Sequence, residues 1–295
     1  MERRLSTPLS EQTIRIGPAG WSYKDWEGIV YPQKPGSKFD PLGYLSGFFD
    51  TIEINSTFYR PPSPATAASW VNRIERNPKF KFTAKLYRVF THEHGGATVQ
   101  DETEYRRGLE PIFQAGRLGA ILLQFPWSFK NTGPEREHLA RLLKQFSDYP
   151  LVVELRHASW NMPEVVEWFE ESGVGFCNID QPLFRHSIKP SSLATSKVGY
   201  IRLHGRNYRT WFSENRQPSD RYDYLYPPDE LEPWVERVRM VSQHTRETFV
   251  VTNNHYLGKA VANALDIKAL LAGEKVRGPA ILCERYPHLR EIIRL

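Results

Sequence analysis

The chain has 295 residues, of which 40% are hydrophobic, and it carries a formal net charge of +5 with a pI near 9.1. This length suits one large domain, and no apolar run approaches the roughly 20 residues that span a bilayer. Residues 1–12 contain no apolar signal segment, and the two cysteines, Cys177 and Cys283, lie far apart. We therefore expect a soluble, cytoplasmic protein with no membrane contact and no disulfide framework.

Eight short segments rich in Ile, Val, Leu, Phe and Thr predict buried β-strands. In chain order they span residues 13–17, 51–55, 80–86, 119–125, 151–157, 174–180, 199–205 and 248–254. A stretch long enough for a crossover follows seven of the eight, and this alternation predicts a single-domain α/β fold, the (β/α)8 TIM barrel. We expect residues 1–12 to form an N-terminal arm and 277–295 a C-terminal tail that packs on the barrel.

Several crossovers carry helix signals. Ser63 is the expected N-cap of the first, with Pro64 in its first turn, and Asn161 is the expected cap of a later one. The helical stretches are 63–77, 134–148, 161–173, 228–244 and 257–273. The link at 181–197 is short and lacks a clear helical pattern, so we expect an irregularity in the barrel there.

The longest connection follows the seventh strand and covers residues 207–228. It interleaves aromatic and arginine residues over a length that is uncommon for a structureless loop in a compact domain. Its expected place on the mouth of the barrel favours a lid or a binding loop.

Polar side chains gather at the ends of the predicted strands, where a barrel of this kind builds its active site. Residues two apart share a face of a strand, so these side chains are expected to point in pairs toward the barrel axis. They are Glu53, Asn55, Lys85, Gln124, Glu154, Arg156, Asp180, Arg202, His204, Asn253 and Asn254.

The mixed charges favour acid–base chemistry on an anionic, phosphate-bearing substrate. In this interpretation Lys85, Arg156 and Arg202 bind the anion, and the catalytic proton carriers are Glu154, Asp180 and His204. The remaining substrate-binding residues would orient the ligand or stack on it: Glu53, Asn55, Asn253, Asn254, Trp21 and Tyr59.

Three alternatives stay open. A divalent metal could be held by Glu53, Glu154, Asp180 and His204, although we assign no metal ligands. The aromatic and basic loops could bind nucleic acid, or cut its phosphodiesters as TIM-barrel endonucleases do. In a barrel without catalysis, the three carboxylates would simply neutralise Lys85, Arg156 and Arg202. No P-loop, GxGxxG or GxSxG motif points to an organic cofactor, so any cofactor is unknown, as are protein partners.

Seven stretches carry a resemblance to a known family. They are GPAGWSYKDWEGIVYP (17–32), TIEINSTFYRPPSPATAASW (51–70), FKFTAKLYRVFTH (80–92), LLQFPWSF (122–129), ELRHASW (154–160), YIRLHGR (200–206) and TNNHYLGKAVANA (252–264). Together they resemble the YecE-like proteins, domain of unknown function 72, over nearly the whole chain. Pro18-Ala19 before Gly20-Trp21, and Thr252 before the paired asparagines, depart from the family pattern. The resemblance implies a TIM barrel and brings no reaction with it.

Overall fold

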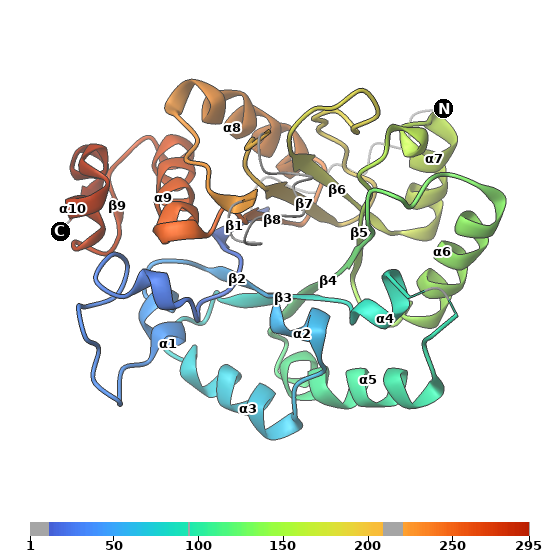
Figure 1. Cartoon of the computed structure of the whole chain (residues 1–295), viewed down its shortest axis with the longest axis horizontal. Helices are drawn as coiled ribbons and strands as arrows, with labels where there is room; N and C mark the ends of the chain where they lie inside the picture. Colours follow the sequence, from blue (N-terminus) through green and yellow to red (C-terminus); the bar gives the residue numbers. More distant parts are fainter. Residues whose placement is uncertain (1–11, 94, 209–220, 295) are drawn as a thin grey trace.

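Eight parallel strands form one sheet that curls into a barrel in the computed structural model, which describes residues 12–93, 95–208 and 221–294 (Figure 1). All eight predicted strands are confirmed, in the order β1-β8-β7-β6-β5-β4-β3-β2. Their bounds are β1 Thr13–Pro18, β2 Thr51–Ile54, β3 Lys81–Lys85, β4 Leu118–Gln124, β5 Leu151–Glu154, β6 Gly175–Asp180, β7 Val198–Leu203 and β8 Glu247–Thr252. The chain is therefore a single-domain, TIM-barrel-like α/β protein.

The barrel is nearly closed at the seam between β1 and β2. The two strands approach so closely that a Cβ added at Gly17 would lie 1.8 Å from the carbonyl oxygen of Thr51. Just beyond β1, Ala19 and Glu53 form a parallel bridge, and the amide of Gly20 donates to the Glu53 carbonyl at 2.9 Å. A residue without a side chain at position 17 is thus what lets the ends of the sheet meet.

Helices cover the outside of the barrel (Figure 1). The α-helices are α1 Pro41–Ser46, α2 Ser56–Tyr59, α3 Pro64–Arg73, α4 Arg88–Thr91, α5 Val99–Gln114, α6 Gly133–Gln145, α7 Pro163–Ser172, α8 Pro228–Ser242, α9 Lys259–Ala272 and α10 Leu282–Arg285. Short 3-10 turns span Lys24–Trp26, Ala158–Trp160, Tyr256–Gly258 and Pro287–Glu291. No helix joins β6 to β7, as the sequence of 181–197 predicted.

The helix caps confirm one prediction and correct another. The Ser63 side chain accepts from the amide of Thr66 and caps α3. Asn161 is not the cap of α7, because Met162 holds that position and Pro163 begins the helix. Asn161 instead ends the preceding 3-10 turn. The error arose because an Asn beside a Met-Pro pair fits the N-cap pattern, while proline at the first helical position sets the boundary one residue later.

Polar side chains and one aromatic ring fill the barrel interior in layers. At the amino-terminal end, Glu247 accepts from Arg15 at 2.8 Å and from Lys81 at 2.7 Å. Above it, the Phe249 ring occupies the space that a side chain at Gly119 would need. Higher still, the hydroxyls of Thr83 and Tyr200 lie 2.8 Å apart, and the next layer is the cluster described below.

The C-terminal segment packs back on α9. Strands β9 Val276–Arg277 and β10 Ile293–Arg294 pair with each other, and the Tyr286 hydroxyl donates to the Leu257 carbonyl at 2.7 Å. Of the predicted N-terminal arm only Gln12 is described, and residues 209–220 of the predicted mouth loop lie outside the described residues. Within the described ranges, no helix is both long and apolar enough to cross a bilayer.

Candidate functional site

Arg202, near the end of β7, is the centre of a fully buried ion-pair cluster in the upper barrel. One guanidinium nitrogen donates to Glu53 on β2 at 2.6 Å, and the other donates to Glu154 on β5 at 2.6 Å. The second nitrogen also donates to the side-chain carbonyl of Gln124 on β4 at 3.0 Å. Arg202 therefore links side chains of four strands, and these side chains point into the barrel, as the alternation of faces along each strand predicted.

Glu154 accepts from three side chains. Besides Arg202, it accepts from Arg156 at 2.7 Å and from His204 Nε2 at 3.2 Å, both on its other oxygen. Burial, the largest influence, raises the pKa of Glu154, but Arg202, His204 and Arg156 together hold it well below its usual range. Glu154 is therefore a firmly ionised carboxylate whose oxygens are occupied.

His204 is fully buried and neutral. Burial lowers its pKa to about 3, and the neighbouring Arg202 and Arg156 act in the same direction against the opposing effect of Glu154. Asn253 Nδ2 lies 3.1 Å from His204 Nδ1, and His204 Nε2 lies 3.2 Å from Glu154 and 3.4 Å from a guanidinium nitrogen of Arg202. These contacts on both ring nitrogens orient the imidazole.

Lys85, at the end of β3, differs from the other cations of this cluster. Its residue is only 9% exposed, yet no hydrogen bond or ion pair reaches its Nζ from the described part of the chain. Its Nζ lies over the ring of Phe58, 5.5 Å from the ring centroid. Burial and the positive charge of Arg202 lower the pKa of Lys85 to about 8, although Glu53 and Glu154 oppose this.

Asp180, predicted to join the strand-end cluster, belongs to a neighbouring one. Its carboxylate accepts from Arg206 at 2.9 and 3.0 Å and from the Tyr226 hydroxyl at 2.5 Å. Tyr226 also accepts from the amide of Gly205 at 2.8 Å, which ties the end of the long connection to β7. Sequence reasoning missed both partners; Arg206 stands directly after the strand-seven motif, whereas nothing local marks Tyr226.

The predicted asparagines divide between the mouth and the scaffold. Asn254 is fully buried and donates to the Tyr224 carbonyl and to Asn263, so it braces α9 against the long connection. Asn55 donates to the Tyr23 hydroxyl at 3.3 Å, and its own side-chain oxygen is buried without a hydrogen-bond partner. An unsatisfied buried acceptor of this kind suits a ligand donor.

The two predicted aromatic contacts have different surroundings. Trp21 is half-buried and packs edge-on against Trp70, with ring centroids 5.4 Å apart. Tyr59 is 68% exposed, and its ring meets Phe58 at 5.2 Å. Trp21 thus packs against the protein, while the exposed ring of Tyr59 is accessible to a ligand at the rim.

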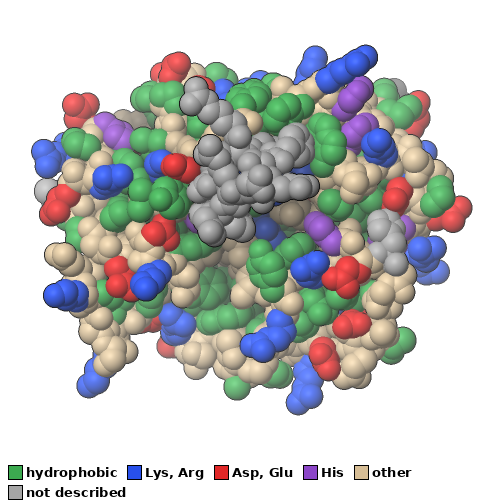
Figure 2. Space-filling model, in the orientation of Figure 1, with side chains coloured by type: hydrophobic (Ala, Val, Ile, Leu, Met, Phe, Trp, Pro, Cys, Tyr) green, Lys and Arg blue, Asp and Glu red, His purple; other side chains and the backbone are tan. Residues whose placement is uncertain are grey.

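The mouth of the barrel opens on the side where α2 and α4 follow β2 and β3. Figure 2 shows this face hollowed near its centre, with the colour of Lys and Arg side chains visible in the hollow. His92, which follows α4, reflects the positive surroundings: its pKa is lowered to about 4 by burial first, and then by Arg156, Arg88 and Lys85. The described mouth residues therefore form an environment that disfavours added positive charge.

The carboxylates of the site are arranged to bind arginine side chains and not a metal ion. In the described ranges, no group of three or more His, Cys, Asp or Glu side chains is placed to hold a metal. Glu53 and Glu154 direct their oxygens at the guanidinium of Arg202, and Asp180 lies with Arg206. The four ligands of the metal alternative are thus not gathered around one point.

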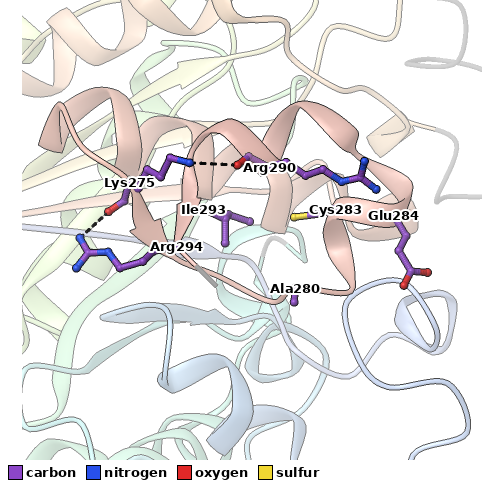
Figure 3. A pocket seen from close by; sticks show the side chains of 7 residues that line it. All are labelled: Lys275, Ala280, Cys283, Glu284, Arg290, Ile293 and Arg294. Carbon is purple, nitrogen blue, oxygen red and sulfur yellow. Dashed lines mark hydrogen bonds between the residues drawn. The ribbon is translucent and has the colours of Figure 1, made fainter.

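A separate cavity of about 540 Å³ lies at the C-terminal segment (Figure 3). Its lining residues are Lys275, Ala280, Cys283, Glu284, Arg290, Ile293 and Arg294. None of them belongs to a barrel strand or to a loop at the carboxyl ends of the strands, so this cavity is not part of the mouth.

Comparisons with known proteins agree with this architecture. The model of the family described as "Protein of unknown function DUF72" matches residues 15–283. A DUF72 family protein of Thermotoga maritima is similar in structure, with 34% identity, a TM-score of 0.76, and coverage of 88% of this chain and 99% of that one.

A second DUF72 structure, from Enterococcus faecalis, has 25% identity, a TM-score of 0.76, and coverage of 88% of this chain and 96% of that one. A search of curated proteins finds no match. The extent of the family match, together with the barrel and the strand-end motifs, shows that this chain belongs to the DUF72 family of YecE-like proteins.

Proposed function

We propose that this protein is an enzyme that binds an anionic, phosphate-bearing substrate at the carboxyl-terminal mouth of its barrel and acts on it by acid–base chemistry. Lys85 carries the proposal, because it is a nearly buried amine without a hydrogen-bonding partner in the described chain. A buried ammonium group without an acceptor is costly unless a ligand supplies one.

The charge balance of the cluster supports an anion. Among the described residues, Arg202 and Arg156 share the two carboxylates Glu53 and Glu154, which leaves the charge of Lys85 uncompensated. An arginine fork and a lysine point charge are the groups with which proteins commonly bind phosphate. Arg156 retains some exposure, with 16% of its side chain accessible, so a ligand in the mouth can reach it.

The same geometry argues against a purely structural network. In that alternative the carboxylates would neutralise all three cations, but Asp180 pairs with Arg206 and leaves Lys85 aside. A structural cluster gains nothing from an unpaired buried amine, since desolvation opposes it. Groups with perturbed pKa values in a barrel mouth are typical of functional sites.

The assignment of Glu154, Asp180 and His204 as proton carriers stays a prediction. The surroundings of Glu154 and His204 favour positioning, because their pKa values lie well below neutrality and ordinary acid–base catalysts operate near it. Lys85, with a pKa of about 8, is better matched to that task.

Replacing Arg156 by Ala tests the proposal. We expect the affinity for inorganic phosphate, measured by isothermal titration calorimetry at low ionic strength, to fall at least about tenfold, or roughly 1.4 kcal/mol. The fold should persist, because Glu154 keeps its contacts with Arg202 and His204.

Arg76→Ala is the matched control, since it removes the same charge from an exposed position. Its phosphate affinity should equal that of the unmodified protein. Equal affinity in Arg156→Ala, or no phosphate binding by the unmodified protein, would contradict the proposal.

Nucleic acid is the second candidate ligand, and exposed aromatic side chains on the mouth loops favour it. Tyr59 is 68% exposed and Tyr208 is 51% exposed, and such rings can stack on unpaired bases. Of the arginines in the predicted loop, Arg209 and Arg216 lie outside the described residues, and Arg206, directly before it, pairs with Asp180.

A further inference from the structure

We infer that Lys85 is a covalent nucleophile, whose ε-amine condenses with the carbonyl group of an anionic aldehyde or ketone to form an imine. This inference rests on the proposed anion site and narrows its substrate class from phosphate-bearing compounds to phosphorylated carbonyl compounds. It also gives Lys85 a role distinct from that of an anion clamp.

The position of Lys85 satisfies the first requirement of an amine nucleophile, an ε-amine that no ion pair among the described residues holds in place. Within the described chain, neither a carboxylate nor a carbonyl accepts from its Nζ, whereas Arg202 and Arg156 are both held in ion pairs. By contrast Lys81, at the opposite end of the same strand, is fixed on Glu247 at 2.7 Å. One strand therefore carries a structural lysine at its beginning and an unengaged lysine at its end.

The neighbours of Lys85 satisfy the second requirement, a larger fraction of neutral amine than an ordinary lysine has. The side chain lies against the Phe58 ring and close to the guanidinium of Arg202, so apolar surface and a like charge both disfavour an ammonium ion. A lysine desolvated beside another cation is an established way to activate an amine. At pH 7 the free-amine fraction of Lys85, whose pKa is about 8, is on the order of a hundredfold that of an ordinary lysine.

The other ionisable groups of the mouth do not offer this chemistry. His204, His92 and His255 have pKa values of about 3, 4 and 4, and each is lowered first by burial. Glu154 is engaged by three donors. Of these groups, Lys85 is therefore the one primary amine, and a primary amine is what condensation to an imine requires.

The reaction balances without a further reagent. The Nζ lone pair forms the N–C bond as the carbonyl π bond breaks, and the oxygen takes up a proton to give a carbinolamine. The nitrogen lone pair then forms the second C–N bond as the C–O bond breaks, and the oxygen leaves as water that carries both former amine protons, relayed by solvent. In this arrangement Arg156 holds the anionic end of the substrate while Lys85 attacks its carbonyl carbon.

Reductive trapping tests the inference with two matched probes. The purified full-length protein is incubated with glycolaldehyde phosphate or with uncharged glycolaldehyde in the presence of sodium cyanoborohydride, and the adducts are mapped by peptide mass spectrometry. We expect glycolaldehyde phosphate to label Lys85 at least tenfold faster than the exposed Lys24 and Lys79 in the same digest. Uncharged glycolaldehyde should label Lys85 at least tenfold more slowly than its phosphate ester does.

Lys85→Arg separates this inference from the proposed function, since it keeps the charge and removes the nucleophile. We expect this variant to bind inorganic phosphate within about threefold of the unmodified protein, which is near the ordinary uncertainty of such comparisons. Arg156→Ala should retain Lys85 but lose the rate advantage of the phosphorylated probe.

The outcomes distinguish the imine at Lys85 from the anion site of the proposed function. If phosphate binds in an Arg156-dependent manner but Lys85 is labelled no faster than the exposed lysines, the imine is overturned and the anion site stands. If both aldehydes label Lys85 equally fast and phosphate does not bind, the anionic substrate class is overturned together with the proposed function. Selective labelling by the phosphorylated aldehyde supports both.

Discussion

At the scale of single residues, the mouth of this barrel combines a cluster of short ion pairs, in which the buried Nε of Arg202 has no hydrogen-bond partner among the described residues, with one amine that forms no ion pair. Arg202, Glu53 and Glu154 are fully buried at contact distances of 2.6 Å, and such a cluster is strongly destabilised when one partner is removed. Lys85 stands beside it without a hydrogen-bond acceptor in the described chain. The residue that weakens the fold is thus the one best suited to meet a ligand.

The sign of this effect predicts how Lys85→Met changes stability with pH. The folded-state pKa of about 8 lies below the unfolded value, so between about pH 8 and 10.5 the unfolded chain binds more protons. Native Lys85 therefore costs stability below pH 8, and that cost disappears as the pH rises toward 10.5. We expect Lys85→Met to raise the free energy of unfolding in urea by about 1–3 kcal/mol at pH 7 and by much less at pH 10.

Lys79→Met, at an exposed position, is the control and should change the unfolding free energy by less than about 0.5 kcal/mol. A Lys85→Met variant that is less stable than the unmodified protein at pH 7 would show that Lys85 stabilises the fold. That result would remove the main support for an unpaired amine.

Sequence reasoning could predict the site residues that stand on strands, because strand geometry fixes which face they share. Glu53, Glu154 and Arg202 were predicted to share the barrel interior because alternate residues of a strand share a face, and they do. Asp180 follows the same rule but pairs with Arg206, which stands in the loop beyond β7. A loop side chain has no period, so its partner could not be read from spacing.

At the scale of elements, the seam between β1 and β2 decides whether the barrel closes. Glu53 stands on β2 and also takes part in the bridge to Ala19, so the seam and the site are physically continuous. Gly17 is the residue that makes the close approach sterically acceptable, because the missing side chain would meet the backbone of Thr51.

We accordingly expect Gly17→Ala to be severely destabilising. A Cβ 1.8 Å from the carbonyl oxygen of Thr51 on β2 cannot be relieved by rotating a side chain, so the backbone must shift. The expected loss is about 3–5 kcal/mol in the free energy of unfolding, read from urea denaturation followed by circular dichroism. Gly36→Ala is the control, since nothing lies within 4 Å of the added carbon, and it should be nearly neutral.

A loss in Gly17→Ala no larger than that in Gly36→Ala would mean that the seam is wider than described. At this scale the strands were predictable, because each is a short apolar run. The exact start of α7 was not, because Asn161 and Pro163 signal boundaries one residue apart and only the folded chain selects between them.

At the scale of the whole molecule, the net charge is a modest +5. The salt dependence of binding distinguishes a small anion from a nucleic acid as the ligand. A small anion bound by Arg156 and Lys85 needs few charge contacts, whereas a nucleic acid that neutralises six phosphates loses affinity with salt at a log–log slope of about −4 to −5. We expect fluorescence anisotropy with a labelled single-stranded oligonucleotide to give weak binding and a slope shallower than about −2 between roughly 50 and 200 mM salt.

A slope steeper than about −4, with affinity insensitive to Arg156→Ala, would instead favour the nucleic-acid alternative, because many loop cations would then contribute equally. Arg156→Ala distinguishes the cases, since it removes one group of the mouth and leaves the loop cations in place. The Arg156→Ala variant thus tests both the phosphate site and the nucleic-acid alternative.

The sequence by itself determined the architecture of this protein, because eight apolar runs separated by crossovers have few other ways to bury their surfaces. It also determined that polar residues gather at the carboxyl ends of the strands, since parallel strands bring those ends to one face. Only the tertiary structure decided how those charges pair: Arg202 takes both glutamates, Arg206 takes Asp180, and Lys85 is left without an acceptor among the described residues. Pairing depends on distances of a few ångströms between strands far apart in the chain, and no local pattern encodes those distances.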